Sequence, residues 1–253
     1  MKFSKYQGLG NDFIIVERPE IDGMSVSDIC NRRTGVGADG ILLITPNEQS
    51  SFDMKVYNAD GSVPEMCGNG LRCAAAYLRD TDQAPADSFL MGTGAGPIRV
   101  RYSDAHVTAD MGQVMHRPPQ VVALPERQFA GQYISTGNPH FVIFEALSAD
   151  EHRKFGPLLC HHDAFPVGAN ISFAVVHNRQ EVELVVWERG CGLTQACGTG
   201  ACATTVSGWL QGHLAPSEVS VCLPGGRLMI SGTPDNVVMT GPAVHVFDGV
   251  LST

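Results

Sequence analysis

The chain repeats itself around two short cysteine motifs. Residues 66–74 read MCGNGLRCA and residues 196–203 read ACGTGACA, so a cysteine is followed by glycine, one variable residue and glycine in both. The lead cysteines, Cys67 and Cys197, lie 130 residues apart (197 − 67). A protein that must act on both faces of one carbon atom needs two such motifs that face each other. Duplication of a half would supply that symmetry.

Further landmarks recur at almost the same spacing, so the repeat runs through most of the chain. The matching segments are residues 10–13 and 137–141, 37–39 and 168–170, 56–58 and 186–188, and 91–98 and 223–228. A repeat of this length indicates a duplicated domain, because solenoid units are only about 20–50 residues long. Two halves of about 125 residues also match the common domain size of about 100–150 residues.

The repeat therefore predicts two pseudo-symmetric domains. We expect residues 1–113 together with 243–253 to form an N-terminal half that carries Cys67. Residues 114–242 are expected to form a C-terminal half that carries Cys197. The apolar tail is expected to pair back onto the first half, and the active site is expected in the cleft between the two domains.

Short apolar runs bounded by turn residues predict that much of the chain is strand. The expected strands are residues 13–17, 40–44, 52–57, 98–102 and 106–110 in the first half, and 141–144, 171–177, 181–187, 218–222, 228–231 and 237–240 in the second. Helices are expected at 71–79 and 201–211, each directly after its Cys-Gly-x-Gly, and at 27–33 and 149–159.

Composition limits the functional classes. The hydrophobic fraction of 43% and charged fraction of 17% are those of an ordinary globular protein. A net charge of −9 argues against a nucleic-acid or membrane surface as partner. The chain has no apolar run of about 18 residues and no apolar leader at residues 1–6, so we expect a cytoplasmic protein. In that compartment the eight cysteines should be reduced, which favours catalysis or burial over disulfides.

A cysteine at the start of a helix is suited to proton transfer. A free thiol has a pKa of about 8.5, so only a small fraction is thiolate at neutral pH. The N-terminus of a helix carries about half a positive charge and unpaired N–H groups, which favour the thiolate. The same N–H groups can bind a carboxylate, and glycines leave room for its approach.

Two such helix ends on opposite sides of one carbon atom would suit inversion of an amino acid. One thiolate would remove the α-proton, and the opposite thiol would deliver a proton to the other face. The developing charge would be stabilised by preorganised donors in a dry site. A pyridoxal cofactor is not expected, because none of the four lysines lies beside a phosphate-binding loop. We therefore expect no cofactor and no metal.

The motifs resemble those of the diaminopimelate epimerase family from nearly end to end. The segments that carry the resemblance are residues 5–13, 58–62, 66–73, 137–140, 188–190 and 194–200. The resemblance implies an isomerase that converts LL- to meso-2,6-diaminoheptanedioate, for lysine and peptidoglycan precursors. It also implies an α/β (α+β) fold of two similar domains, each a mostly antiparallel sheet or barrel wrapped around a central helix, and a homodimer.

Carried over by position, the resemblance implies that Cys67 and Cys197 are the acid/base pair. The residues that it assigns to the carboxylate at the reacting centre are Gly68, Asn69, Gly198 and Thr199. Those that it assigns to the far amino-acid end are Asn11, Asn58, Asn138, Asn170 and Arg189, with Glu188 able to take the ammonium group. His140 and Glu188 match residues that tune the thiol pKa, and His140 could also exchange protons near pH 7.

The chain departs from the family pattern at several positions. Gly40 and Leu193 replace a frequent glutamine and glutamate, Cys191 a small residue, and Cys160 a common glutamate. Phe247 replaces a tyrosine that belongs to the family's dimer contact. The remaining cysteines, Cys30, Cys73, Cys202 and Cys222, are interpreted as inert buried thiols.

Other functions remain open from the residues alone. A cofactor-independent racemase of histidine or proline is the nearest alternative; proline racemases have histidine where this chain has Asn69. Arg189 and the distal asparagines favour a substrate with a second amino-acid end. A thiol redox or zinc-binding module would predict disulfide cycling or bound metal. Residues 160–163 read CHHD, but neighbouring residues rarely bind one ion together, and no second cluster has zinc-like spacing.

Overall fold

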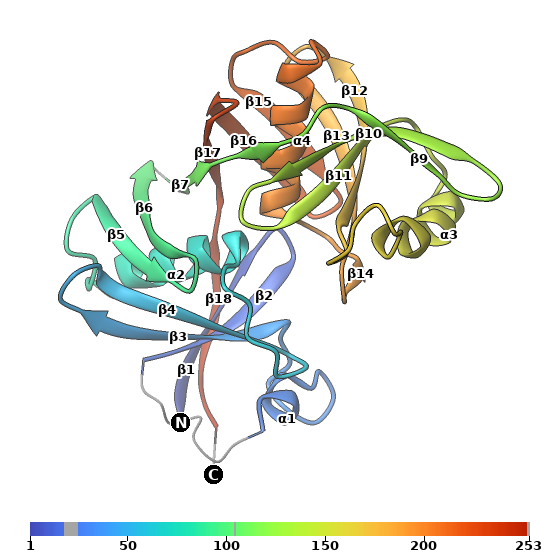
Figure 1. The fold of residues 1–253 in the computed structure, drawn as a ribbon. Coiled ribbons are helices and arrows are strands. Elements are labelled where there is room, and N and C mark those ends of the chain that lie inside the picture. The colour runs from blue at the N-terminus through green and yellow to red at the C-terminus, as the bar shows by residue number, and fades with distance from the viewer. Residues whose placement is uncertain (18–24, 104, 252–253) are drawn as a thin grey trace. The chain divides into compact units, whose positions relative to one another are not determined.

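The chain folds into two compact units in a computed structural model that describes residues 1–17, 25–103 and 105–251 (Figure 1). Unit 1 comprises Met1–Asp110 and Thr240–Thr253, and unit 2 comprises Met111–Met239. The C-terminal segment thus belongs to the same unit as the N-terminus. Each unit is described by itself below.

Unit 1 is a sheet with two helices. Its elements are β1 (Lys2–Gly8), β2 (Asn11–Val16), α1 (Val26–Cys30), β3 (Gly40–Asn47), β4 (Ser51–Asn58), α2 (Gly68–Asp80), β5 (Ser88–Thr93), β6 (Gly96–Ser103), β7 (His106–Gln113, ending beyond the unit) and β18 (Val244–Val250). The pairs β18–β1, β1–β2, β3–β4, β5–β6 and β6–β7 are antiparallel, whereas β2–β3 and β4–β5 are parallel.

Unit 2 contains the second set of elements. They are β8 (Met115–His116), β9 (Gln120–Ala123), β10 (Gln128–Ser135), β11 (Pro139–Phe144), α3 (Ala149–Cys160), β12 (Asn170–Asn178), β13 (Glu181–Glu188), β14 (Gly192–Leu193), α4 (Gly198–Leu210), β15 (Val219–Leu223), β16 (Gly226–Thr233) and β17 (Asn236–Pro242, ending beyond the unit). The pairs β10–β11, β12–β13 and β15–β16 are antiparallel, and β11–β12 and β13–β15 are parallel.

The two units share one order of strand pairing. In unit 1 the path β1–β2–β3–β4–β5–β6 alternates antiparallel and parallel pairs, and the path β10–β11–β12–β13–β15–β16 of unit 2 alternates in the same way. The parallel pairs require crossovers, which α1 and α2 provide in unit 1 and α3 and α4 in unit 2. The sequence repeat is therefore a repeat of topology, and the expected fold class is confirmed.

The helices α2 and α4 are the central elements of their units. α2 contacts β1, β2, β3, β4 and β18, and α4 contacts β10, β11, β12, β13, β15 and β16. Eleven consecutive residues are buried in each helix, from Gly68 to Leu78 and from Gly198 to Gly208. A helix enclosed by strands must be apolar or small on all sides, and both helices are rich in glycine and alanine near the start.

Several boundaries differ from those expected. α2 and α4 begin at Gly68 and Gly198, three residues earlier than predicted, so the glycines form the first turn. α1 ends at Cys30 rather than residue 33, because Asn31 is extended and its side chain caps the following turn. The strands β1, β5, β9 and β10 were not predicted, nor were the two-residue strands β8 and β14.

The apolar tail forms β18, which pairs with β1 along its length. Lys2 lies opposite Val250 and Gln7 opposite Val244. Met1 and Leu251 are thereby close, and the amine of Met1 donates to the carbonyl of Leu251 at 2.7 Å. Among the described residues, no helix has the length and apolar character to cross a membrane.

Candidate active site

A cysteine stands at the N-cap of each central helix. Cys67 precedes α2 with φ −140° and ψ 111°, and Cys197 precedes α4 with φ −129° and ψ 106°. Both conformations are extended, as expected for an N-cap. The Sγ of Cys67 accepts from the N–H of Gly70 at 3.4 Å, which holds the sulfur over the first turn. Cys67 is half-buried and Cys197 is buried.

The second glycine of each motif lets the helix approach the sheet. A Cβ on Gly70 would lie 3.0 Å from Leu42 Cδ2, and one on Gly200 would lie 3.0 Å from Val186 Cγ2. The cysteine is also close, because the Gly70 Cβ would be 3.5 Å from Cys67 Sγ. The Cys-Gly-x-Gly pattern therefore reflects packing of the helix start as well as access for a ligand.

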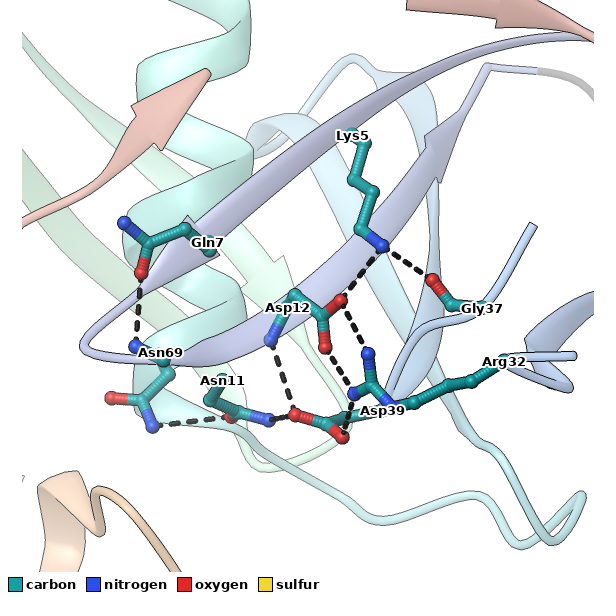
Figure 2. A network of polar contacts seen from close by, with 9 residues as sticks. Lys5, Gln7, Asn11, Asp12, Arg32, Gly37, Asp39 and Asn69 are labelled. Atoms are coloured by element: carbon teal, nitrogen blue, oxygen red, sulfur yellow. Dashed lines mark hydrogen bonds and ion pairs between the residues drawn. The ribbon is translucent and has the colours of Figure 1, made fainter. Parts of the chain in front are cut away.

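In unit 1, hydrogen bonds connect the first turn of α2 to the strand that begins at Asn11. Asn69 donates from Nδ2 to Asn11 Oδ1 at 3.1 Å, and Asn11 donates from Nδ2 to Asp39 Oδ2 at 2.7 Å (Figure 2). Arg72 donates from Nη2 to Asn69 Oδ1 at 2.9 Å. Two of the predicted binding residues, Asn11 and Asn69, are thus in direct contact.

Charged side chains surround Asp39, which accepts a hydrogen bond from Asn11. Arg32 donates from Nη2 to Asp39 at 2.6 Å and forms two bonds to Asp12, at 2.6 and 3.0 Å (Figure 2). Lys5 lies 2.8 Å from the same carboxylate of Asp12. Burial alone would raise the pKa of Asp12, but the hydrogen bonds from Arg32 and Lys5 lower it to about 2. The Asp12 carboxylate is therefore ionised at neutral pH.

Asn58 lies at the same end of the sheet as Asn11. Phe13 pairs with Gly40, and Gly40 pairs with Asn58, so the relevant ends of β2, β3 and β4 are adjacent. Asn58 donates to Ser62 at 2.9 Å in the turn that follows β4. Glycine at position 40 has a packing reason, because a Cβ there would lie 2.6 Å from the carbonyl oxygen of Tyr57.

In unit 2, a buried carboxylate accompanies the thiol of Cys197. Burial raises the pKa of Cys197 well above its ordinary value, and the charge of Glu188 raises it further. Burial also raises the pKa of Glu188, while hydrogen bonds from Thr194 and Cys197 oppose that rise. The Thr194 hydroxyl donates to Glu188 Oε1 at 2.5 Å. Cys197 and Glu188 are therefore a coupled acid pair.

His140 lies behind the first turn of α4 and is fully buried. Its Nε2 is 3.0 Å from Thr199 Oγ1, and its Nδ1 is 3.2 Å from Ser172 Oγ. Burial lowers the pKa of His140 to about 3, so the ring is neutral at pH 7. A neutral ring does not favour the proton exchange near pH 7 that was expected of His140. The ring lies beside Thr199, whose hydroxyl is 3.5 Å from Cys197 Sγ.

The other predicted residues of unit 2 lie around the same strand ends. Asn170 begins β12 opposite His140, with its Nδ2 3.4 Å from His140 Nε2. Its Oδ1 accepts from the backbone N–H of Arg189 at 2.8 Å, and the Arg189 guanidinium donates to the carbonyl of Val167. Asn138 is half-buried in the turn between β10 and β11, where Gly137 has φ +93°.

Sequence reasoning missed several residues of these networks. They are Asp39, Arg32 and Arg72 in unit 1 and Ser172 and Thr194 in unit 2. Ser172 on β12 contacts His140 on β11, and Thr194 contacts Glu188 at the end of β13. Both contacts form only when the chain folds. A polar residue at an inward-facing position of a buried strand was the one available signal for Ser172.

Each unit thus places one thiol at the N-cap of its central helix. A thiol at a helix N-cap is surrounded by N–H groups and fixed polar side chains, which can stabilise a thiolate or bind a carboxylate. Among the described residues, no group of three or more His, Cys, Asp or Glu side chains is arranged to hold a metal ion.

Solved structures with similar folds have very different sequences. A probable proline racemase from Agrobacterium radiobacter K84 gives a TM-score of 0.77 at 12% identity, over 99% of this chain and 92% of that chain. A phenazine biosynthesis protein of the PhzF family from Bacillus anthracis gives 0.76 at 13% identity, over 99% of both chains. These likenesses establish the fold alone.

Sequence comparison identifies the family. The family model of diaminopimelate epimerase matches twice, at residues 3–117 and 132–246. A diaminopimelate epimerase from Desulforudis audaxviator (strain MP104C) is 42% identical over 98% of each chain. Another from Synechococcus sp. (strain JA-3-3Ab) is 43% identical over 100% of this chain and 98% of that protein. The resemblance of the motifs is thereby confirmed, and the chain belongs to the diaminopimelate epimerase family.

Proposed function

We propose that this protein is a cofactor-independent epimerase that converts LL-2,6-diaminoheptanedioate to the meso form. The reaction would supply precursors of lysine and peptidoglycan. Membership of the family supports the substrate. The observation that carries the chemistry is the presence of one thiol at the N-cap of the buried helix in each of two units of the same topology.

The proposed reaction is a two-base inversion. One cysteine, as thiolate, takes the α-proton and becomes a thiol; the other, as thiol, gives its proton to the opposite face and becomes a thiolate. In between, negative charge builds up on the substrate carboxylate. We assign its stabilisation to the first turns of α2 and α4, at Gly68 and Asn69 and at Gly198 and Thr199. The mechanism requires both helix N-termini to face one α-carbon when substrate is bound.

The far end of diaminopimelate carries an ammonium and a second carboxylate. We assign its binding to Asn11, Asn58, Asn138, Asn170 and Arg189. A guanidinium can bind a carboxylate with two parallel hydrogen bonds, and amide oxygens accept from an ammonium. Glu188 and His140 act on the Cys197 side, where Glu188 shares a proton with the thiol and neutral His140 holds Thr199 in place.

Solvent exchange tests this function directly. The freshly reduced protein is incubated in deuterated water with LL-diaminopimelate, with proline and with histidine in parallel samples. We expect deuterium at the α-position of diaminopimelate, together with the meso isomer, and none in the other two. Exchange into proline or histidine alone would assign the protein to another racemase class, and exchange into none of the three would refute the proposal.

We also propose that the protein is a cytoplasmic homodimer. The structure shows no disulfide at any of the eight cysteines, and a thiol mechanism requires a reducing compartment. Three apolar side chains on β18 are 42–49% exposed: Val244, Val246 and Phe247. An exposed apolar strip of this kind on a sheet suits burial against a second copy of the chain.

A further inference from the structure

A buried cation lies beneath the first turn of α2. Arg72 is 0% exposed. Its guanidinium contacts include Asn69 Oδ1 at 2.9 Å, the Pro242 carbonyl at 3.2 Å and the Gly68 carbonyl at 3.4 Å. An arginine in a protein stays protonated, and burial of a charge is unfavourable, so its position calls for a functional explanation.

The fold makes room for this guanidinium. Gly8, at the end of β1, lies against it, and a Cβ on Gly8 would be 3.2 Å from Arg72 Nη2. The charge acts on the neighbouring thiol of α2: burial raises the pKa of Cys73 to about 12, and Arg72 opposes that rise. Gly68, whose carbonyl accepts from Arg72, directly follows Cys67 in the chain.

The guanidinium also fixes the orientation of two amides. Arg72 can only donate and the Asp39 carboxylate can only accept, and Asn69 and Asn11 lie in series between them. The Asn69 oxygen must therefore face Arg72, and the Asn11 nitrogen must face Asp39. Neither amide can flip without placing donor against donor or acceptor against acceptor.

The other charges at this end of α2 balance one another. Asp12, on β2, is bound by Lys5 of β1 and by Arg32, and Asp39 is also bound by Arg32 (Figure 2). This cluster contains two cations and two anions. Arg72 is a further cation outside this cluster. Its guanidinium donates hydrogen bonds to Gly68 and Asn69 in the first turn of α2.

Unit 2 has the opposite electrostatic character. At the repeat spacing of 130 residues, Arg72 corresponds to Cys202, a buried thiol, and Asn58 corresponds to the carboxylate of Glu188. Asn69 corresponds to Thr199, whose hydroxyl contacts the neutral ring of His140 instead of a guanidinium. The duplication thus preserved the two thiols. A cation is hydrogen-bonded to the carbonyl of the residue after Cys67, whereas an anion lies beside Cys197.

We propose that Arg72 is a positioning residue that orients Asn69 and favours the thiolate of Cys67. Cys67 therefore ionises at lower pH than Cys197, and the ligand-free protein holds a thiolate at Cys67 and a protonated thiol at Cys197. This inference rests on the proposed function for its meaning in catalysis. There, Cys67 takes the substrate proton in the first turnover of the resting enzyme, and a proton must return from Cys67 to Cys197 before the next.

Alkylation of the two thiols tests the proposal without any substrate. The full-length reduced protein is treated with iodoacetamide between pH 5 and 10, and modification is quantified separately for the Cys67 and Cys197 peptides. The two thiols are compared by the pH at the midpoint of each alkylation profile. The midpoint does not depend on how exposed the thiol is, whereas the absolute rate of alkylation does. We expect the Cys67 midpoint to lie below that of Cys197. The reverse order in the wild-type protein would overturn the proposal.

Substitution of Arg72 identifies the cause. In Arg72→Met the Cys67 midpoint should rise by about one pH unit, which slows its alkylation about tenfold at pH 7. Arg72→Lys, which keeps the charge, should restore most of the rate even if the amide orientation is lost. The Cys197 profile should stay unchanged in both variants.

A matched control and a second readout exclude a purely structural effect. Arg101→Met removes an exposed arginine on β6 of the same unit and should leave both profiles unchanged. If Arg72→Met fails to fold, Arg72→Lys, which keeps the positive charge, is compared with Arg72→Gln, which removes it. An unchanged Cys67 midpoint in a folded Arg72→Gln protein would contradict the proposal. Epimerisation, measured by solvent exchange, is scored separately, so its absence would reject the function while the alkylation profiles still decide the role of Arg72.

Discussion

At the scale of single residues, the two N-cap cysteines share the same backbone geometry but have different neighbours. Cys67 and Cys197 both cap a helix in an extended conformation. Cys67 is half-buried, and the carbonyl of the next residue, Gly68, accepts from Arg72. Cys197 is buried beside a carboxylate that raises its pKa. The same local structure therefore places the two thiols among different charged neighbours.

Replacement of either thiol should remove epimerisation. Cys67→Ser and Cys197→Ser should each lower kcat by on the order of 10²–10⁴-fold, because a serine hydroxyl is too weak an acid and base to replace a thiol in proton transfer. The measurement is conversion of LL-diaminopimelate to the meso isomer. Cys191→Ser, at an exposed cysteine, serves as the control and should keep full activity. Full turnover in either of the first two variants would exclude that cysteine from the mechanism.

The carboxylate of Glu188 should control the ionisation of Cys197. Because burial and the charge of Glu188 raise the pKa of that thiol, Glu188→Gln should lower the midpoint of Cys197 alkylation by about one pH unit. The control is Glu183→Gln, an exposed carboxylate on the same strand, which should have no effect. A midpoint that rises in Glu188→Gln would show that the carboxylate favours the thiolate instead.

Buried His140 should make the protein lose stability in mild acid. Its pKa of about 3 in the folded state is below the ordinary value of about 6.5, so the unfolded chain binds the extra proton first. The free energy of unfolding should therefore be highest above pH 6.5 and fall as the pH decreases toward 3, by at most about 1.4 kcal/mol per pH unit from this group. Urea unfolding at a series of pH values measures this slope, and His140→Asn should flatten it. An imidazole that titrates near pH 6.5 in the folded protein would refute the assignment.

At the scale of elements, close approach of helix and strand determines where the active thiols lie. The start of α4 approaches β13 and β11 closely at Gly200. A Cβ on Gly200 would be 3.0 Å from Val186 Cγ2 and 3.2 Å from His140 Cε1. Gly70 has the same position in unit 1, against Leu42. The start of each central helix is therefore held at a fixed depth in its sheet.

Gly200→Ala should push α4 away from β13. We expect a loss of about 1–3 kcal/mol in the free energy of unfolding from overpacking, together with lower activity. Val186→Ala removes the crowding methyl group, so the double variant Gly200→Ala/Val186→Ala should be more stable than the sum of the single effects predicts. Denaturant unfolding of the four proteins measures the coupling. Additive effects would show that Val186 does not limit the helix position.

The sequence predicted the elements that have a clear apolar run or a motif, and it missed elements whose apolar pattern is interrupted by residues needed for close packing. The central helices and strands such as β12 and β13 were expected because apolar runs and the Cys-Gly-x-Gly motif mark them. β10 was missed because its pattern is interrupted at Gly131, where a Cβ would lie 2.6 Å from Phe141 Cζ. The motif cysteines could be predicted from repetition alone. The roles of Arg72 and Asp39 could not, since their partners are distant in sequence or hidden until the strands assemble.

At the scale of the whole molecule, duplication explains the topology and an exposed strand suggests the assembly. Both units use the same succession of antiparallel and parallel pairs. β18, at the C-terminal end of the chain, completes unit 1 by pairing with β1 and exposes Val244, Val246 and Phe247. This strand therefore serves both the fold of unit 1 and, in our proposal, the contact with a second copy.

A charge on this strip should separate the proposed dimer. Phe247→Glu places an anion in an apolar interface, where an unpaired charge is strongly unfavourable, so the variant should sediment as a monomer at concentrations at which the wild type is a dimer. Val121→Glu, at a 61% exposed valine on β9, is the control and should leave the assembly intact. Analytical ultracentrifugation distinguishes the two states. A wild-type protein that sediments as a monomer would reject the dimer itself.

The hydrogen bond between the N-terminal amine and the carbonyl of Leu251 has a consequence for protein engineering. Since Met1 and Leu251 meet, a short linker from residue 251 to residue 1 could close the backbone without disturbing β1 or β18. New ends could then be opened at the exposed turn of residues 125–126, between β9 and β10. A circular permutant of this kind would present the gene's second half first and still retain every strand pair of unit 1.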